Sequence, residues 1–216
     1  MSLELEQGRP EITPMRSIMP PHVVLRDLFD EQTVTGLLDY ALAHERTFAP
    51  TGVSHGKANS FKPHFRVSLG LRDLGPFKPI LQVKVLGLVP DLVVKLGATP
   101  MESPKLELQL VAHNEGAFYK RHIDTQTASN RNHIRALSAV YYFHAEPKAF
   151  SGGMLRLYGI GGEGSVDIEP ERNMLLVFPS WAPHEVMPIN CPSRRFVDSR
   201  FAINCWIYRK KATAIE

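Results

Sequence analysis

Cysteine is scarce in this sequence, with only Cys191 and Cys205 among 216 residues. A small secreted domain that depends on disulfides needs several cysteine pairs, so two cysteines exclude a disulfide framework. We expect both thiols to be reduced, as they are in cytoplasmic proteins.

Long apolar runs are also lacking. No segment has the roughly 20 consecutive apolar residues that cross a bilayer, so no membrane contact is expected. Near the start of the chain, Glu4, Glu6 and Glu11 stand where a secretory signal would have basic residues followed by an apolar run. The sequence therefore predicts a cytoplasmic protein.

An excess of one charge is missing as well. The chain has 25 Lys and Arg against 22 Asp and Glu, a net charge of +3 with histidine neutral. The basic residues do not gather into one stripe, which would be the footprint of a nucleic-acid-binding surface. No aromatic and basic platform for a flipped base is visible either. We expect no nucleic-acid partner.

The length suits one domain with a substantial core, since a domain of this size buries about 70% of its unfolded surface. We predict an irregular lead-in over residues 1–20 and a single domain over residues 21–216. Within that domain, residues from about 21 to 100 should form a helical support and residues from about 104 to 209 a β core.

The N-terminal half mixes strands, helices and a loop. We expect, in order, a strand over His22–Leu25, a helix over about Glu31–Glu45, an exposed loop over Phe48–Pro63, a strand over Phe65–Leu71 and a second helix over about Pro76–Leu96. Asp27 or Asp30 can cap the first helix, whose apolar residues have the spacing of one buried stripe. Pro90 predicts a break or kink in the second helix. The loop is either a binding lid or a passive surface excursion.

Short strands dominate after Pro104. The expected strands are Leu106–Leu110, Ala136–His144, Gly153–Tyr158, Ser165–Ile168, Met174–Phe178, His184–Ile189 and Phe201–Tyr208. Short strands at such spacing, separated by Gly, Pro, Asn and Ser, are typical of a sandwich or barrel. The predicted fold class is mainly β with N-terminal helices: a jelly-roll core packed by two or three helices.

One stretch of the β core has the pattern of a metal site. His122 and Asp124 follow a predicted strand, and residues i and i+2 of a strand point to the same side, so both can reach one ion. His184 opens a later strand after a Pro-containing turn. Two histidines and one carboxylate form a facial triad that leaves positions open on Fe(II). The seven remaining histidines lack a ligand-spaced partner and are expected to be ordinary surface or core residues: His22, His44, His55, His64, His113, His133 and His144.

Five motifs follow one another along this half of the chain. They are Tyr119-x-x-His122-x-Asp124; Tyr141-Tyr142-Phe143 followed by Gly152-Gly153-Met154-Leu155-Arg156-Leu157-Tyr158; Asp167-Ile168-Glu169-Pro170; Pro183-His184-Glu185-Val186; and Arg200-Phe201-Ala202-Ile203-Asn204-Cys205-Trp206. In this order the region from about Leu106 to Arg209 resembles the Fe(II)- and 2-oxoglutarate-dependent dioxygenases of the prolyl 4-hydroxylase type. That group includes the prolyl hydroxylases that modify hypoxia-inducible factor.

The resemblance implies a double-stranded β-helix that binds Fe(II), with 2-oxoglutarate as cosubstrate, molecular oxygen as reactant and ascorbate as an optional reductant. It places Arg200 and Tyr142 on the distal carboxylate of 2-oxoglutarate. The usual spacing after the distal histidine would favour Arg194 or Arg195, but Arg200 begins an alternating strand and residues 190–199 have the composition of an inserted loop.

The resemblance also implies contacts with the pocket or the substrate by Tyr119, Arg135 and Trp206. No catalytic residue is expected beyond the metal centre. The implied reaction is hydroxylation of a C–H bond with release of succinate and CO2, foremost of a prolyl residue in a protein or peptide that the loops 48–63 and 125–135 could clasp. Two alternatives stay open: a hydroxylase of a free amino acid or other small metabolite, and a non-enzymatic metal-binding sensor.

Overall fold

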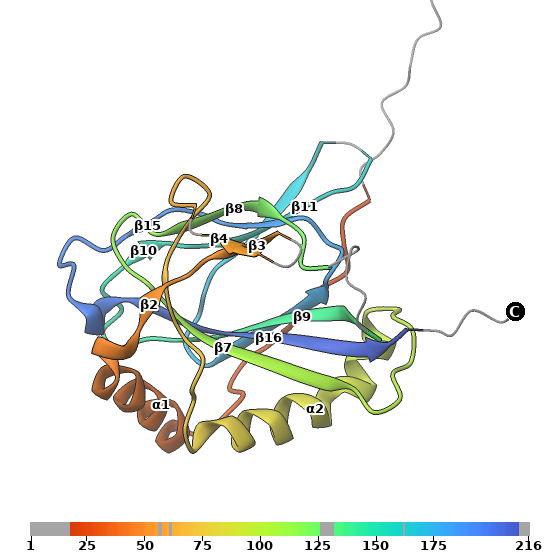
Figure 1. Ribbon diagram of the computed structural model, residues 1–216, viewed down its shortest axis with the longest axis horizontal. Coiled ribbons are helices and arrows are strands. Elements are labelled where there is room, and N and C mark those ends of the chain that lie inside the picture. The colour runs from red at the N-terminus through yellow and green to blue at the C-terminus, as the bar shows by residue number, and fades with distance from the viewer. Residues whose placement is uncertain (1–17, 56–57, 61, 126–131, 162, 212–216) are drawn as a thin grey trace, which may run out of the picture.

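The computed structural model describes residues 18–55, 58–60, 62–125, 132–161 and 163–211. Within these residues two antiparallel sheets face each other, and two long helices lie on the outer side of the larger sheet (Figure 1). This arrangement confirms the predicted fold class, mainly β with N-terminal helices around a jelly-roll core.

The larger sheet has seven strands in the described part of the chain. Their order is β1 (Val23–Leu25), β13 (Met174–Pro179), β9 (His133–Phe143), β16 (Arg200–Lys210), β7 (Lys105–His113), β6 (Leu69–Leu71) and β2 (Ala49–Pro50). The order in the smaller sheet is β12 (Ser165–Ile168), β11 (Leu155–Tyr158), β14 (His184–Val186), β8 (Phe118–His122) and β5 (Arg66–Val67). Two further pairs are β3 (Val53–His55) with β4 (Ala58–Ser60), and β10 (Ser151–Gly152) with β15 (Ile189–Asn190).

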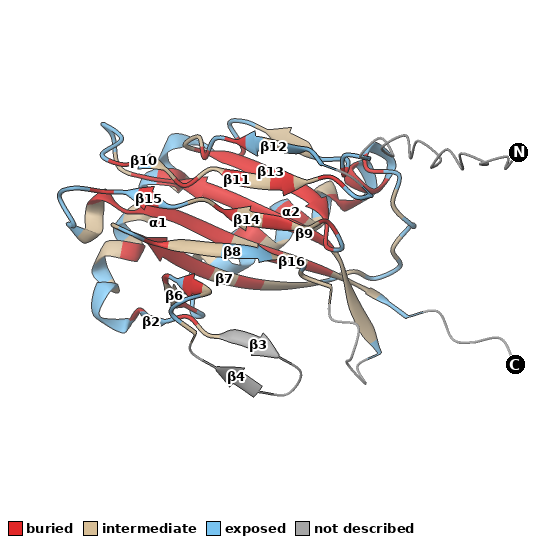
Figure 2. Cartoon of the chain, turned by 90° about the horizontal axis from the view of Figure 1, so that it is seen from above, coloured by how far each residue is buried: buried red, intermediate tan, exposed pale blue. Residues whose placement is uncertain are grey.

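Alternation along β9 divides the core into two layers. Because successive side chains of a strand point to opposite faces, Tyr141 and Phe143 pack toward the helices, in one cluster with residues of both. Val140 and Tyr142 point the other way, into the space between the sheets. Burial is concentrated along these central strands (Figure 2). The inner layer is where a site can be enclosed.

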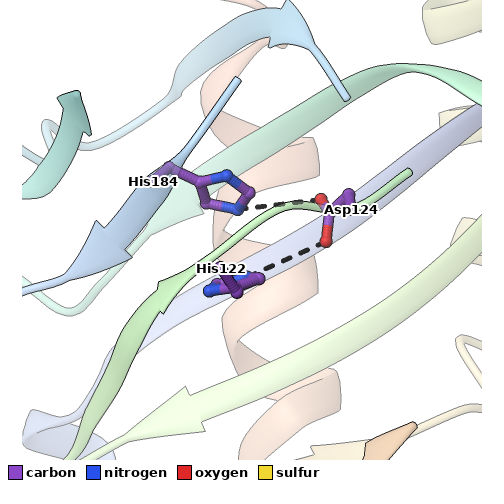
Figure 3. A group of neighbouring side chains, drawn as sticks. All are labelled: His122, Asp124 and His184. Carbon is purple, nitrogen blue, oxygen red and sulfur yellow. Dashed lines mark ion pairs between the residues drawn. The ribbon is translucent and has the colours of Figure 1, made fainter. Parts of the chain in front are cut away.

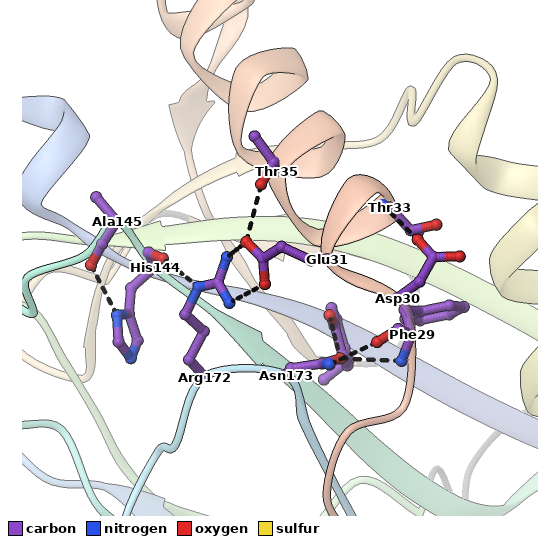
Figure 4. A network of polar contacts seen from close by, with 10 residues as sticks. Phe29, Asp30, Glu31, Thr33, Thr35, His144, Ala145, Arg172 and Asn173 are labelled. Atoms are coloured by element: carbon purple, nitrogen blue, oxygen red, sulfur yellow. Dashed lines mark hydrogen bonds and ion pairs between the residues drawn. The ribbon is translucent and has the colours of Figure 1, made fainter.

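Helix α1 (Glu31–Ala43) begins where the sequence predicts. Of the two candidate caps, Asp30 is the one used: its carboxylate accepts from the N–H of Thr33 at 2.7 Å. Arg172 donates through Nη1 to Glu31 at 2.7 Å, and the Asn173 side chain bonds the backbone of Phe29 (Figure 4). These contacts attach the start of the helix to the turn before β13.

Helix α2 (Phe77–Lys95) runs through Pro90 as one helix, so the break that Pro90 predicted is wrong, while the alternative of a kink stays a prediction. Proline removes one backbone hydrogen bond, but apolar residues are buried on both sides of it, Val89 before and Leu92 and Val93 after. Their packing against the sheet outweighs the local cost.

The region Phe48–Pro63, expected to be one exposed loop, contains β2, β3 and β4. Strand β2 pairs with β6, and β3 pairs with β4. Residues 56–57 and 61 lie outside the described residues, as do residues 126–131 of the second predicted loop and residues 1–17 of the lead-in. The proposed lid and clasp therefore stay predictions.

The predicted strand Phe65–Leu71 is two strands in different sheets. Strand β5 pairs with β8 of the smaller sheet and β6 with β7 of the larger sheet. The chain crosses between them at Ser68, whose buried hydroxyl contacts Thr51 and accepts from Nε of Arg66. The predicted strand His184–Ile189 is likewise divided into β14 and β15, with Pro188 between them.

Two features of the structure bear on the scarcity of cysteine and of long apolar runs. Cys191 and Cys205 are both free and buried. No helix in the described residues is both long enough and apolar enough to cross a membrane.

Candidate metal centre and carboxylate pocket

Three residues of the smaller sheet meet at one point. His122 ends β8 and His184 opens β14, and the two are paired directly across these neighbouring strands. Asp124 follows β8, and its N–H donates to the carbonyl of Ser180 at 2.9 Å. One possible ligand atom from each residue lies within 4.8 Å of the others (Figure 3). The structure thus brings together the residues that the sequence singled out as metal ligands.

Backbone carbonyls orient both histidine rings. Nδ1 of His122 lies 2.7 Å from the oxygen of Lys120, and Nδ1 of His184 lies 2.9 Å from the oxygen of Ala182. A carbonyl oxygen can only accept, so each Nδ1 carries the proton. Each Nε2 keeps its lone pair, and these atoms lie 3.8 and 3.7 Å from oxygens of Asp124. A ring that binds a metal through Nε2 needs this tautomer.

The carboxylate of Asp124 is held by one of its two oxygens. Oδ2 accepts from the hydroxyl of Ser138 at 2.7 Å and from the indole Nε1 of Trp206 at 2.9 Å. The Ser138 hydroxyl also lies 2.9 Å from the hydroxyl of Ser180. Oδ1 is left to face His122, so the carboxylate is arranged to offer one oxygen to an ion.

The protonation states suit a cation. Burial, reinforced by nearby His184, lowers the pKa of His122 to about 3. Burial alone would raise the pKa of Asp124, but His184, His122 and the hydrogen bond from Ser138 outweigh it and lower that pKa. Near neutral pH His122 is therefore neutral and the aspartate charged, which are the forms that bind metal ions.

Arg200 lines the other side of the pocket, and Tyr142 packs behind it. Both are buried and face the space between the sheets, with the guanidinium carbon 4.7 Å from the centre of the Tyr142 ring. Nε and Nη2 of Arg200 and the hydroxyl of Tyr142 have no hydrogen-bond partner among the described residues. An unpaired buried guanidinium is unfavourable. These donors, arranged as a fork, match a carboxylate.

Gly153 makes room for this arginine. Its backbone has φ +69, and a Cβ there would lie 2.8 Å from Cδ of Arg200 and 2.7 Å from Cγ1 of Ile189. A larger residue would require the side chain of Arg200 or Ile189 to shift. The close packing around Gly153 therefore explains why a glycine is needed at this position before β11.

The two alternative arginines lie elsewhere. Arg195 pairs with Asp198 at 2.8 Å, and 70% of its side chain is exposed. Arg194 is exposed at the tip of the same turn. Among the arginines compared by spacing, the geometry favours Arg200 as the carboxylate anchor, although its function stays a proposal.

The three residues expected to contact the pocket or the substrate differ in position. Tyr119 and Trp206 line the pocket, and Tyr119 stacks on the ring of His122 with 3.6 Å between ring centres. Arg135 is not among the residues that line this pocket. Its guanidinium lies over the Trp206 ring at 4.2 Å and pairs with Glu107 at 3.1 Å. Arg135 therefore supports the pocket wall, and a substrate contact by it stays untested.

Two pocket residues escaped the sequence analysis. Arg66 is 6% exposed, donates to Ser68 and lies over the ring of Tyr119 at 4.7 Å. His113, expected to be an ordinary histidine, is buried beside Arg200. The strand predicted over Leu106–Leu110 ended before His113, so no local signal identified this residue.

The residues present fit an iron ion and a dicarboxylate cosubstrate. Two Nε2 lone pairs and one carboxylate oxygen form the donor set of a facial triad. Arg200, two of whose donor nitrogens are unpaired among the described residues, lines the same pocket, and Tyr142 lies beside it. An anion held by these donors can extend toward the triad.

Comparison with known proteins agrees with this geometry. A family model described as the 2OG-Fe(II) oxygenase superfamily matches residues 108–208. A protein of Synechocystis sp., described as an uncharacterised PKHD-type hydroxylase, is 36% identical over 162 residues, which are 71% of this chain and 52% of the relative. The chain therefore spans about half the length of this relative.

Solved structures show the same fold. A prolyl-4-hydroxylase of Pseudomonas putida superposes with a TM-score of 0.65 at 22% identity, covering 89% of this chain and 94% of the other. A prolyl hydroxylase of Trichoplax adhaerens, solved with a peptide of a hypoxia-inducible factor, has a TM-score of 0.67 at 22% identity and covers 88% and 84%. At this identity the likeness concerns the architecture.

Proposed function

We propose that this chain is an Fe(II)- and 2-oxoglutarate-dependent dioxygenase, because a family model of the 2OG-Fe(II) oxygenase superfamily matches its residues 108–208. It hydroxylates a C–H bond of a prolyl residue in a protein or peptide and releases succinate and CO2. The observation that carries this proposal is the unpaired fork of Arg200 in the same pocket as the His122, Asp124 and His184 triad.

Each part of the site has a definite task in this reaction. His122 and His184 present Nε2, and Asp124 presents Oδ1, so that three protein ligands leave the opposite side of an ion open. Arg200 and Tyr142 donate to the distal carboxylate of 2-oxoglutarate and fix its direction. When bound, Fe(II) and 2-oxoglutarate supply the oxidising chemistry with oxygen, and ascorbate serves as reductant.

Part of the pocket wall is apolar. Val140, Leu155 and Val186 line it, and Val140 and Leu155 belong to the cluster between the sheets. These side chains limit the access of water and strengthen the charge interactions of Arg200 with a carboxylate. The presence of the Asp124 carboxylate as third ligand supports hydroxylation over halogenation.

A prolyl substrate is supported by the family motifs and by the names of the similar proteins. The curated relative is described as a hydroxylase, and the two solved structures are described as prolyl hydroxylases, one of them with a peptide bound. A free amino acid or another small metabolite is the competing substrate class, and the experiment below separates the two.

The test measures the release of labelled CO2 from 2-oxoglutarate labelled at C1, with Fe(II), ascorbate and a panel of proline-containing peptides. We expect a productive peptide to increase the release and to gain the mass of one oxygen atom on proline. Stimulation by a free amino acid alone would assign the small-molecule alternative. No binding of iron or 2-oxoglutarate would favour the non-enzymatic sensor.

Two arginine variants provide a matched comparison. Arg200→Ala removes the buried fork, whereas Arg195→Ala removes an exposed arginine that pairs with Asp198. We expect the first to raise the KM for 2-oxoglutarate by at least about a hundredfold, since a buried charged hydrogen-bonded pair is lost, and the second to leave it unchanged. If Arg195→Ala raised the KM and Arg200→Ala did not, Arg195 would be the residue that binds the carboxylate.

A further inference from the structure

A buried histidine contacts the carboxylate anchor from the neighbouring strand. His113 is the last residue of β7 and Arg200 the first of β16, and the two are directly opposed in the antiparallel ladder. Nδ1 of His113 lies 3.1 Å from Nη1 of Arg200. His113 is 3% exposed and Arg200 is 1% exposed. The sheet register itself therefore produces this contact.

The chemistry of the two side chains fixes the direction of the hydrogen bond. A guanidinium has five N–H donors and no acceptor, so Nη1 must donate and Nδ1 of His113 must accept. His113 is then neutral, with its proton on Nε2. Burial, together with the nearby guanidiniums of Arg200 on β16 and Arg66 on β5, lowers the pKa of this ring and opposes its protonation.

The hydrogen bond with His113 leaves the opposite edge of Arg200 free. In a guanidinium, Nε–H and Nη2–H lie side by side on the edge away from Nη1, and they form the side-on fork for a carboxylate. These two nitrogens are the ones without a partner among the described residues. A single acceptor at Nη1 therefore determines which edge of the arginine faces a ligand.

We propose that His113 is a positioning residue for the cosubstrate, and that its neutral Nδ1 holds Arg200 so that Nε and Nη2 face the distal carboxylate of 2-oxoglutarate. The inference rests on the proposed function for the identity of that carboxylate. The two charged side chains near His113, Arg200 on β16 and Arg66 on β5, are donors and cannot replace it as an acceptor for Nη1.

The first test is a binding titration with protein loaded with Mn(II), so that no turnover is needed. His113→Phe keeps a ring but removes the acceptor, whereas His113→Asn keeps an acceptor near the position of Nδ1. We expect His113→Phe to raise the Kd for 2-oxoglutarate by about tenfold or more, because a hydrogen bond to a charged group is lost. His113→Asn should restore binding to within about threefold of the original chain.

A second ligand shows whether the effect passes through the distal carboxylate. The monocarboxylate 2-oxovalerate lacks that group, so its weaker binding should not differ between the original chain and His113→Phe. An equal loss for both ligands would mean a general disturbance of the pocket and would overturn the proposal. The proposal would also be overturned if His113→Gln restored 2-oxoglutarate binding and His113→Asn did not, because Gln places its polar group near the position of Nε2.

Nitrogen NMR of histidine-labelled protein reads the tautomer directly and requires no substitution. We expect the His113 resonances to show an unprotonated Nδ1 and a protonated Nε2. A protonated Nδ1 would contradict the proposal even if every variant failed to fold. If the original chain itself does not bind 2-oxoglutarate while Nδ1 is unprotonated, the proposed function fails and the contact between the two residues stands.

Discussion

The indole of Trp206 orients the carboxylate that completes the metal centre. Its Nε1 donates to Oδ2 of Asp124 at 2.9 Å, and Arg135 lies over its ring. We predict that Trp206→Phe lowers the affinity for Mn(II) by roughly tenfold or more while the fold is kept, because residues that support metal ligands typically contribute 10–100-fold. Titration of the metal with calorimetric detection measures this.

The chain contains its own control for this substitution. Its other tryptophan, Trp181, is 45% exposed, so Trp181→Phe should leave metal affinity unchanged. Equal affinities for Trp206→Phe and the original chain would show that Ser138 alone suffices to hold Asp124.

Residue patterns predicted the triad but not its supports. His122 and Asp124 could be grouped because positions i and i+2 of a strand share a face. The backbone carbonyls that orient the two histidine rings could not be predicted, because their positions depend on the folded turns. His113 lacked a neighbour in sequence with which to form a site. Its partner Arg200 is 87 positions away, and strand pairing was needed to reveal the contact.

At the scale of the elements, the turn before β11 is built around Arg200. Gly153 has φ +69, and a Cβ there would lie 2.8 Å from Cδ of Arg200. We predict that Gly153→Ala destabilises the fold by at least about 1–2 kcal/mol, the cost of a left-handed conformation for a residue with a Cβ. It should also weaken 2-oxoglutarate binding, because the arginine must move. Chemical denaturation and the binding titration measure the two effects.

Gly87 of helix α2 is the matched control. A Cβ at Gly87 would meet nothing within 4 Å, and the residue is exposed within the helix. Gly87→Ala should therefore stabilise the fold by about 0.5–1 kcal/mol without changing ligand binding. If Gly87→Ala lowered the free energy of unfolding, the placement of Gly87 on the exposed side of the helix would be wrong.

The start of α1 allows a second prediction for an element. Asp30→Ala removes the cap on the N–H of Thr33 and should lower the free energy of unfolding by about 1 kcal/mol. Asp39→Ala changes an exposed aspartate within the same helix and should cause no loss. Denaturant unfolding measures the free energy of unfolding of both variants. Equal values would show that the contacts of Arg172 and Asn173, and not the cap, stabilise this end of the helix.

Elements were predictable where local signals agree and not where tertiary structure overrides them. The cap of α1 was confirmed. Pro90 predicted a break or kink, but the helix continues through it, with Val89 and Leu92 buried on either side. Alternation would place Arg135 on the same face as Leu137. An irregularity in the pairing of β9 with β16, between Ile207 and Tyr208, turns Arg135 toward Trp206 instead. Such a bulge follows from sheet pairing, which the sequence alone does not define.

For the whole molecule, the architecture assigns separate tasks to the two faces of the larger sheet. The outer face carries α1 and α2 and is filled with apolar residues (Figure 1). The inner face holds the polar groups of the site, among them Ser138, Tyr142 and Arg200. The motifs alone indicated this class of fold, but the division of strand Phe65–Leu71 between the two sheets, which brings Arg66 into the pocket, needed the structure.

Buried histidines make the stability of the whole metal-free protein depend on pH. Burial, with Arg200 and Arg66 nearby, holds the pKa of His113 well below its ordinary value, and burial also lowers the pKa of His144. In the unfolded chain both titrate near about 6.5. Below that pH the unfolded state binds more protons, so the free energy of unfolding falls as the pH falls.

We predict that the free energy of unfolding of the metal-free protein decreases between pH 6.5 and pH 5, by up to about 1.4 kcal/mol per pH unit for each such histidine. His113→Phe removes one of these groups and should make the decrease shallower. Denaturant unfolding at several pH values measures each slope. A slope that is unchanged in His113→Phe would mean that the ring is charged in the folded state, and Arg200 would then need another acceptor for Nη1.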